Sequence, residues 1–107
     1  MSTDNKILLQ DIRARITDRM GDIVHTIILF GSRVQGTSAE HSDYDVLIVL
    51  RENANGAIER EIYDICYEID LDRDILIDAK VLSVEDLATL RGKQPYIQHA
   101  LETGLHI

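Results

Sequence analysis

The sequence predicts one α/β or α+β domain, in which a small mixed sheet of three or more strands is flanked by helices. A chain of 107 residues suits a single domain spanning residues 1–107. Helical and strand periods alternate along it without an internal repeat or a linker. Hydrophobic residues make up 45% and charged residues 28%, which is ordinary globular usage and argues against disorder. Strands mixed with helices at these lengths indicate a sheet covered by helices.

A first helix is expected over residues 5–20. Leu8, Ile12 and Ile16 recur at four-residue spacing, which places them on one face of a helix. Gly21 follows at the point where the periodicity ends, and glycine is a common residue just after a helix.

Two strands are expected next, with a polar loop between them. His25–Phe30 is rich in β-formers, and residues 31–42 are polar and predict a loop with one helical turn. Tyr44–Leu50 is a second strand-like run, made of Val, Leu and Ile after Asp45. In the second strand one face is expected to carry Tyr44, Val46, Ile48 and Leu50, and the other Asp45, Leu47 and Val49.

A second helix and a third strand follow. Asn55 and Gly56 open the helix, and the acidic residues 70–74 after it are interpreted as a solvated connection, with a metal site as the alternative. The strand is expected over Ile75–Leu82. The buried stripe of the helix is predicted to consist of Ile58, Ile62, Ile65 and Ile69.

Two shorter helices are expected near the end of the sequence. Ser83 followed three residues later by Asp86 has the spacing of a capping box, so Ser83 is predicted to begin a helix. Pro95 is predicted to start the last helix at its first position, and Gly104 to end it.

The net charge of −8 bears on the class of partner. A free nucleic-acid binder relies on clustered basic residues, whereas here eleven are scattered among nineteen acidic ones, so no direct nucleic-acid binding is expected. The acidic balance suits metal cations or a basic protein partner, or it serves solubility alone. The single cysteine, Cys66, excludes a disulfide framework and a cysteine zinc site. No apolar run approaches the ~20 residues of a membrane span, so a cytoplasmic protein without membrane contact is expected.

Three carboxylates are the candidate catalytic and metal-binding residues. Asp43 and Asp45 point to the same face of the second strand, with Cα atoms ~7 Å apart. Such a pair offers the oxygen ligands that two Mg²⁺ ions require. Asp78 interrupts the third strand and would meet them if these strands are neighbours. Alternatively, the first two are turn residues and Asp78 is an edge-strand charge facing water.

A phosphate-binding turn is predicted directly after the first strand. Gly31 allows close approach of a ligand to the backbone, and Ser32 offers a hydroxyl and an N–H at the start of a helical turn. Arg33 adds a cation beside the same point, or it is merely exposed.

The arrangement of these residues resembles the motif of the minimal nucleotidyltransferases, within the DNA polymerase β-like nucleotidyltransferase superfamily. The motif is Gly31-Ser32, ten intervening residues, and then Asp43-Tyr44-Asp45, and Ser42 before the first aspartate also fits. The resemblance implies that the sheet has the polymerase β-like nucleotidyltransferase fold. It also implies that the aspartates bind Mg²⁺, that Asp78 completes the metal site or accepts the acceptor's proton, and that nucleotide contacts come from Gly31, Ser32, Arg33 and Ser42.

The resemblance implies transfer of a nucleoside monophosphate, expected to be AMP from ATP, onto a hydroxyl of a partner. Chains of this size are similar to the antitoxin half of HEPN/MNT pairs, in which the nucleotidyltransferase modifies a tyrosine of a HEPN toxin. The implied cofactors are two Mg²⁺ ions with ATP as substrate, and the implied partner is a HEPN-type protein or another substrate-binding chain. The alternatives are a non-catalytic antitoxin or scaffold with a vestigial nucleotide site, and a subunit acting on a small-molecule hydroxyl.

Overall fold

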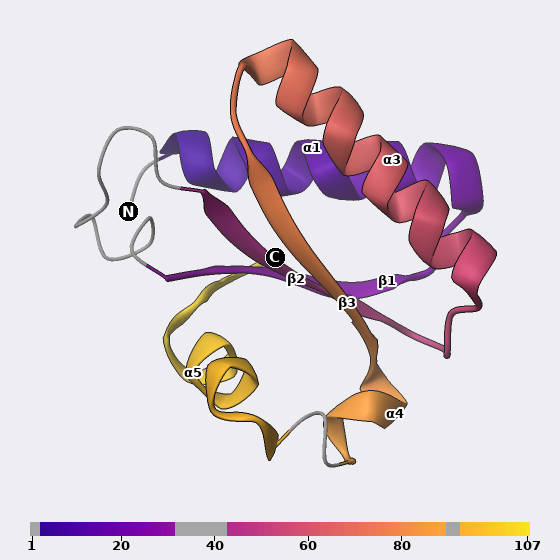
Figure 1. The fold of residues 1–107 in the computed structure, drawn as a ribbon, viewed down its shortest axis with the longest axis vertical. Coiled ribbons are helices and arrows are strands. Elements are labelled where there is room, and N and C mark those ends of the chain that lie inside the picture. Colours follow the sequence, from indigo (N-terminus) through magenta and orange to yellow (C-terminus); the bar gives the residue numbers. More distant parts are fainter. Residues whose placement is uncertain (1–2, 32–42, 90–92) are drawn as a thin grey trace.

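The computed structural model describes residues 3–31, 43–89 and 93–107, with side chains from residue 5 onward. It confirms the predicted fold class, because a four-stranded mixed sheet lies between helices on its two faces (Figure 1). The strands are β1 (Val24–Phe30), β2 (Tyr44–Leu50), β3 (Ile77–Ser83) and β4 (Leu105–His106). The helices on one face are α1 (Thr3–Met20) and α3 (Gly56–Arg73), and on the other α4 (Val84–Leu87) and α5 (Pro95–Thr103).

The strands lie in the order β3-β2-β1-β4. β1 pairs antiparallel with both β2 and β4, whereas β2 and β3 pair in parallel. Helix α3 provides the crossover that a parallel pair requires, since it connects the end of β2 to the start of β3. Because of this order, the first residues of β2 and β3 meet at one end of the sheet, beside the last residue of β1.

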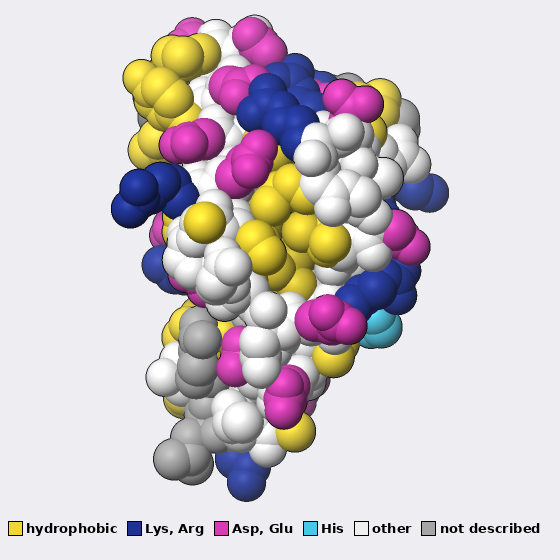
Figure 2. Space-filling model, turned by 90° about the vertical axis from the view of Figure 1, so that its right-hand side faces the viewer, with side chains coloured by type: hydrophobic (Ala, Val, Ile, Leu, Met, Phe, Trp, Pro, Cys, Tyr) yellow, Lys and Arg dark blue, Asp and Glu magenta, His cyan; other side chains and the backbone are white. Residues whose placement is uncertain are grey.

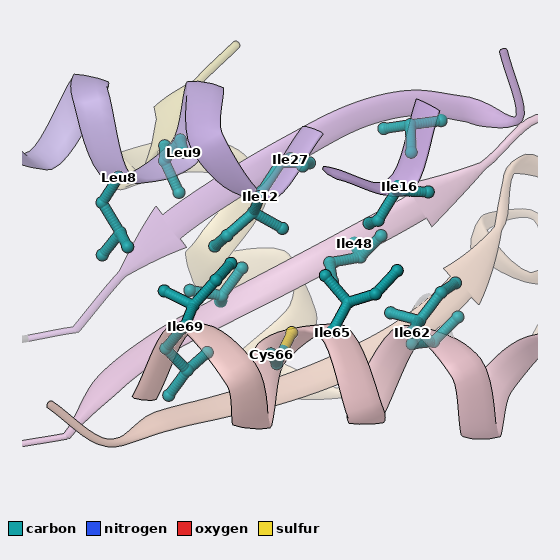
Figure 3. Packing of buried hydrophobic residues seen from close by; sticks show 14 of the residues in the cluster. Leu8, Leu9, Ile12, Ile16, Ile27, Ile48, Ile62, Ile65, Cys66 and Ile69 are labelled. Carbon is teal, nitrogen blue, oxygen red and sulfur yellow. The ribbon is translucent and has the colours of Figure 1, made fainter. Parts of the chain in front are cut away.

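The larger core lies between the sheet and the helices α1 and α3. Figure 3 shows the isoleucine and leucine side chains of the two helices pointing toward one another and toward β1 and β2. The predicted stripes are confirmed, with Ile58 packed at the margin of the cluster. Its fully buried side chains include Leu9, Ile12, Ile16, Ile27, Ile48, Ile62, Ile65 and Ile69.

Helix α1 ends as predicted. Gly21 has φ +82°, and its N–H donates to the carbonyl of Thr17 at 2.9 Å, which closes the last turn. The start of α3 also agrees with prediction. The side chain of Asn55 accepts the N–H of Ile58 at 2.9 Å, as an N-cap residue does.

The interpretation of residues 70–74 as a solvated connection is wrong, because they form the last turn and cap of α3. Asp70 accepts the N–H of Ile77 at 2.9 Å, Asp72 pairs with Arg15 at 2.9 Å, and Asp74 ends the helix in the left-handed conformation, φ 53°. Residues two apart on a helix point in different directions, so these carboxylates diverge and the alternative of a metal site fails as well. As a result, β3 begins two residues later than expected, at Ile77.

The smaller core lies on the opposite face of the sheet, under α5. It consists of Ile28, Leu47, Val49, Leu82, Ile97 and Ala100. Helix α5 contacts β1, while the side chains of Asp78 and Lys80 on β3 are 49% and 48% exposed. The part of this face at the start of β2 and β3 is therefore open among the described residues.

The end of the chain agrees with the expected helices and adds a strand. Ser83 and Asp86 form the predicted capping box, Pro95 stands at the start of α5, and Gly104 caps its end. The short strand β4 was not predicted. It pairs with β1, and a Cβ on Gly104 would lie 2.3 Å from Cγ2 of Ile28, so the tight turn into β4 requires glycine. None of the helices in the described ranges is both long and apolar enough to cross a membrane.

Candidate active site

Asp45 and Asp78 stand side by side on the face of the sheet that also carries α5. In the parallel pairing of β2 with β3 they are direct register partners. Asp45 shares its face with Leu47 and Val49, which belong to the smaller core under α5. Adjacent strands are ~4.8 Å apart, so the two carboxylates are close neighbours. The sequence-based condition that the strands carrying them be adjacent is met.

Asp43 directly precedes β2 and is exposed. Two residues before Asp45, it belongs to the same face of the strand. Burial, followed by the negative charges of Asp78 and Asp43, raises the pKa of Asp45 above its ordinary value. The structure thus brings all three predicted carboxylates into electrostatic contact at one end of the sheet.

Gly31 lies against the same carboxylate. It follows Phe30, the last residue of β1, which is the register partner of Asp45. Gly31 has φ +82°, and a Cβ placed on it would lie 2.6 Å from Oδ2 of Asp45. Both the left-handed backbone and the space beside Asp45 therefore call for glycine. The predicted turn residue and the predicted metal ligand are neighbours.

Lys80 is a member of this group that the sequence interpretation did not assign. Its Nζ lies 3.4 Å from Oδ1 of Asp78, and among the described residues it is the cation whose charge opposes the rise in the pKa of Asp45. The signal was present in the sequence, because residues 78 and 80 of one strand share a face.

Asp70 borders the group from α3. Burial and the charge of Asp43 raise the pKa of Asp70, and the hydrogen bond from the N–H of Ile77 opposes this shift. Asp70 thus holds the start of β3 in place while adding to the negative potential near Asp43.

Three predicted nucleotide-binding residues, Ser32, Arg33 and Ser42, lie outside the described residues. Their roles stay predictions from the sequence. What the structure describes of this loop is its first residue, Gly31, which leaves β1 directly beside Asp45.

The donor chemistry of the site suits Mg²⁺, which binds carboxylate oxygen and keeps several ligand positions for water and substrate phosphate. Gly31 lies so close to Asp45 that a Cβ on it would be 2.6 Å from Oδ2 of this carboxylate. In the part of the chain that the structure describes, no three His, Cys, Asp or Glu side chains enclose a metal by themselves. The carboxylates of Asp43, Asp45 and Asp78 are oxygen donors of the kind that Mg²⁺ binds, so the described residues fit such an ion.

A hollow at the opposite end of the sheet is separate from this group. It has a volume of about 280 Å³, and Figure 2 shows hydrophobic side chains gathered in a depression on that side of the molecule. Its lining includes Ile23, Leu50, Arg51, Ala54 and Ile58. Of the predicted site residues that the structure describes, namely Gly31, Asp43, Asp45 and Asp78, none lines it.

Known proteins resemble this chain in sequence. The sequence pattern of the nucleotidyltransferase domain matches residues 9–96. Two proteins of Methanocaldococcus jannaschii, to both of which protein adenylyltransferase activity is ascribed, are similar to it. One is 31% identical over 99 residues, which cover 88% of this chain and 67% of the relative. The other is 33% identical over 70 residues, which cover 65% and 71%.

Solved structures share the fold. A toxin–antitoxin complex with AMP-PNP contains a chain that matches with a TM-score of 0.58 at 18% identity, covering 98% of this chain and 72% of that one. A mutant of the toxin–antitoxin complex MntA-HpeT matches with a TM-score of 0.56 at 19% identity, covering 100% and 72%. These matches agree with the predicted polymerase β-like fold.

The family match covers Gly31, Asp43, Asp45 and Asp78, and it confirms the sequence-based prediction of the enzyme class. The chain belongs to the nucleotidyltransferase domain family and is an enzyme of the nucleotidyltransferase type.

Proposed function

We propose that this chain is a Mg²⁺-dependent adenylyltransferase that moves AMP from ATP onto a protein hydroxyl, namely a tyrosine of a HEPN-type toxin, in an antitoxin role. The observation that carries this proposal is the register pairing of Asp45 with Asp78 beside Gly31, with Asp43 two residues away. Protein adenylyltransferase activity ascribed to two relatives supports the donor and the protein acceptor. The toxin–antitoxin neighbours, one of them with AMP-PNP, support the partner and the nucleotide.

In this proposal Asp43 and Asp45 hold divalent ions together with the nucleotide, and Asp78 completes the site. Bound Mg²⁺ offsets the charge of the phosphates and polarises the α-phosphoryl group. The turn beginning at Gly31 and Ser32 holds the phosphates, with Arg33 and Ser42 beside it. Because Gly31 has no side chain, the backbone of this turn lies directly against Asp45.

The proposed reaction is a displacement at the α-phosphorus. The acceptor oxygen forms a bond to the phosphorus, the bond to the pyrophosphate oxygen breaks, and pyrophosphate leaves on the Gly31 side. Asp78 takes the proton of the acceptor hydroxyl, since it stands on β3 at the edge of the described sheet, on the side away from Gly31. The catalytic contribution of the protein is mainly positioning and electrostatic stabilisation.

The test is transfer of label from [α-³²P]ATP to the HEPN-type partner in the presence of Mg²⁺, with the modified residue identified by mass spectrometry. The wild-type chain should label one tyrosine, and the double variant Asp43→Ala, Asp45→Ala should not. Asp64→Ala, which removes an exposed carboxylate from α3, is the matched control and should label normally. Labelling by the double variant at the wild-type rate would refute the proposed site.

The competing hypothesis is that this chain neutralises its partner by contact alone, without transferring AMP. Calorimetry with Mg²⁺ and ATP separates the two, because a vestigial site would release no binding heat. Neutralisation of the partner by a chain that binds no nucleotide would replace the enzymatic proposal with the scaffold alternative.

A further inference from the structure

Lys80 lies beside Asp45 and Asp78, two of the carboxylates that the proposed function assigns to metal binding. It stands on β3 two residues after Asp78 and is the register partner of Leu47, so it shares the face of Asp45 and Asp78. Its Nζ is 3.4 Å from Oδ1 of Asp78. The side chain is 48% exposed, which leaves the flexible stem free to reorient.

The ammonium group of Lys80 is a positive charge 3.4 Å from Asp78, on the face of the sheet that also carries Asp45. A divalent cation that approaches these carboxylates alone gains their attraction but is repelled by Lys80. A nucleotide triphosphate is repelled by the carboxylates but is attracted by Lys80. The positive charge of Lys80 therefore disfavours binding of the free metal ion and favours binding of the nucleotide.

We propose that Lys80 is a positioning residue that weakens the binding of free divalent cations and strengthens that of the nucleotide, so that metal enters the site together with ATP. This inference rests on the proposed function and adds to it an order of ligand entry. Before ATP arrives, Lys80 neutralises part of the carboxylate group. When the phosphates arrive, their charge compensates Lys80 and releases Asp78 to the metal.

The size of the effect follows from Coulomb's law. A divalent and a monovalent charge several ångströms apart near a solvated surface repel enough to change a dissociation constant roughly three- to tenfold. Salt screens this interaction, so the effect should shrink as the ionic strength rises.

The experiment measures two dissociation constants for the full chain. Binding of Mn²⁺ without nucleotide is followed by the electron paramagnetic resonance signal of free Mn²⁺. Binding of a non-hydrolysable ATP analogue at saturating Mg²⁺ is followed by calorimetry. In Lys80→Met the Mn²⁺ constant should fall, and the nucleotide constant should rise, each roughly three- to tenfold. Lys80→Arg keeps the charge and should resemble the wild type in both.

Arg51→Met provides a matched control. Arg51 follows the last residue of β2 at the other end of the sheet, is 47% exposed, and lies 3.4 Å from Asp22. It therefore matches Lys80 in charge, in exposure and in the distance to its partner. A change in net charge alone would affect Arg51→Met and Lys80→Met equally, and thermal denaturation of each variant reports whether the fold is intact.

Opposite shifts confined to Lys80→Met support the inference. Shifts of both constants in the same direction, or shifts equal to those of Arg51→Met, overturn it. A wild-type chain that binds no nucleotide with Mg²⁺ would instead remove the proposed function itself, so the two failures are distinguishable.

Discussion

Asp45 and Asp78 are register partners across the parallel pair of β2 and β3, so that two carboxylates face one another on one side of the sheet. Like charges placed directly opposite each other destabilise a sheet. Burial and the neighbouring charges of Asp78 and Asp43 raise the pKa of Asp45, which reports the same conflict. An arrangement that opposes stability is typical of a functional site.

We expect Asp45→Asn to stabilise the metal-free protein near neutral pH. The substitution removes the like-charge contact and should increase the free energy of unfolding by about 0.5 kcal/mol. In a domain of this size that corresponds to a rise in melting temperature of about 2–4 °C. Thermal denaturation followed by circular dichroism measures it. Asp64→Asn is the control for net charge, and a variant less stable than the wild type would contradict the interpretation.

The same comparison has a defined dependence on pH. Because the pKa of Asp45 is raised in the folded state, the folded protein binds this proton more tightly than the unfolded chain does. The stability contributed by the protonated carboxyl is complete below the unfolded pKa and is lost as pH rises through the folded pKa. The advantage of Asp45→Asn should therefore be full at neutral pH and vanish below about pH 4. If the stability difference between Asp45→Asn and the wild type grew on acidification, the pKa of Asp45 would not be raised in the folded state.

Gly31→Ala should affect ligand binding as well as stability. Gly31 and Gly21 both have φ +82°, so alanine at either position should cost about 1 kcal/mol in backbone strain. Their surroundings differ, because a Cβ on Gly31 would lie 2.6 Å from Oδ2 of Asp45, whereas one on Gly21 meets nothing within 4 Å. Calorimetry should thus find weakened Mg²⁺-dependent ATP binding in Gly31→Ala and unchanged binding in Gly21→Ala. Equal ATP binding by both variants would show that Gly31 does not contribute to the nucleotide site.

The thiol of Cys66 should be unreactive in the native protein. Burial raises its pKa to about 12, and Cys66 lies in the core between α3 and the sheet. The thiolate is the reactive form, and little of it is present at pH 8. A colourimetric thiol reagent should therefore react slowly with the folded chain and rapidly after denaturation in guanidinium. Since the sequence has one cysteine, the signal reports this residue alone.

Arg15→Met should weaken the contact between α1 and α3 in a salt-dependent manner. Arg15 pairs with Asp11 at 3.0 Å and with Asp72 at 2.9 Å, which joins the two helices. Loss of both pairs should lower the free energy of unfolding by about 0.5–1 kcal/mol in dilute buffer, and by less near 1 M salt. Denaturant titrations at the two salt concentrations measure the difference. Arg60→Met, at an exposed position of α3, should show a smaller effect.

Local patterns were sufficient for most elements. The four-residue spacing of Leu8, Ile12 and Ile16 predicted α1, and the apolar run of β-branched residues and leucines over Tyr44–Leu50 predicted β2 with the bounds that the structure has. The capping box of Ser83 with Asp86 was also read correctly. Each of these signals depends on residues within one or two turns of one another, which is why they can be read without knowledge of the fold.

The errors occurred where a local pattern was ambiguous or absent. The acidic residues 70–74 have the composition of a loop, but the first of them continues the buried helix, and Asp74 caps it. Strand β4 is two residues long, too short for any periodicity. It pairs with the side of β1 that faces away from β2, and Gly104 allows the close approach.

For the site, the sequence alone determined the residues that lie close together along the chain. Gly31 after one strand, and Asp43 with Asp45 on one face of the next, follow from the two-residue period of a strand. Only the tertiary structure decided that β3 lies parallel beside β2 in the register that pairs Asp78 with Asp45, and that Lys80 joins them on the same face. The physical reason is that strand order and register result from how α1, α3 and α5 cover the two faces of the whole sheet, and no short stretch of sequence contains that information.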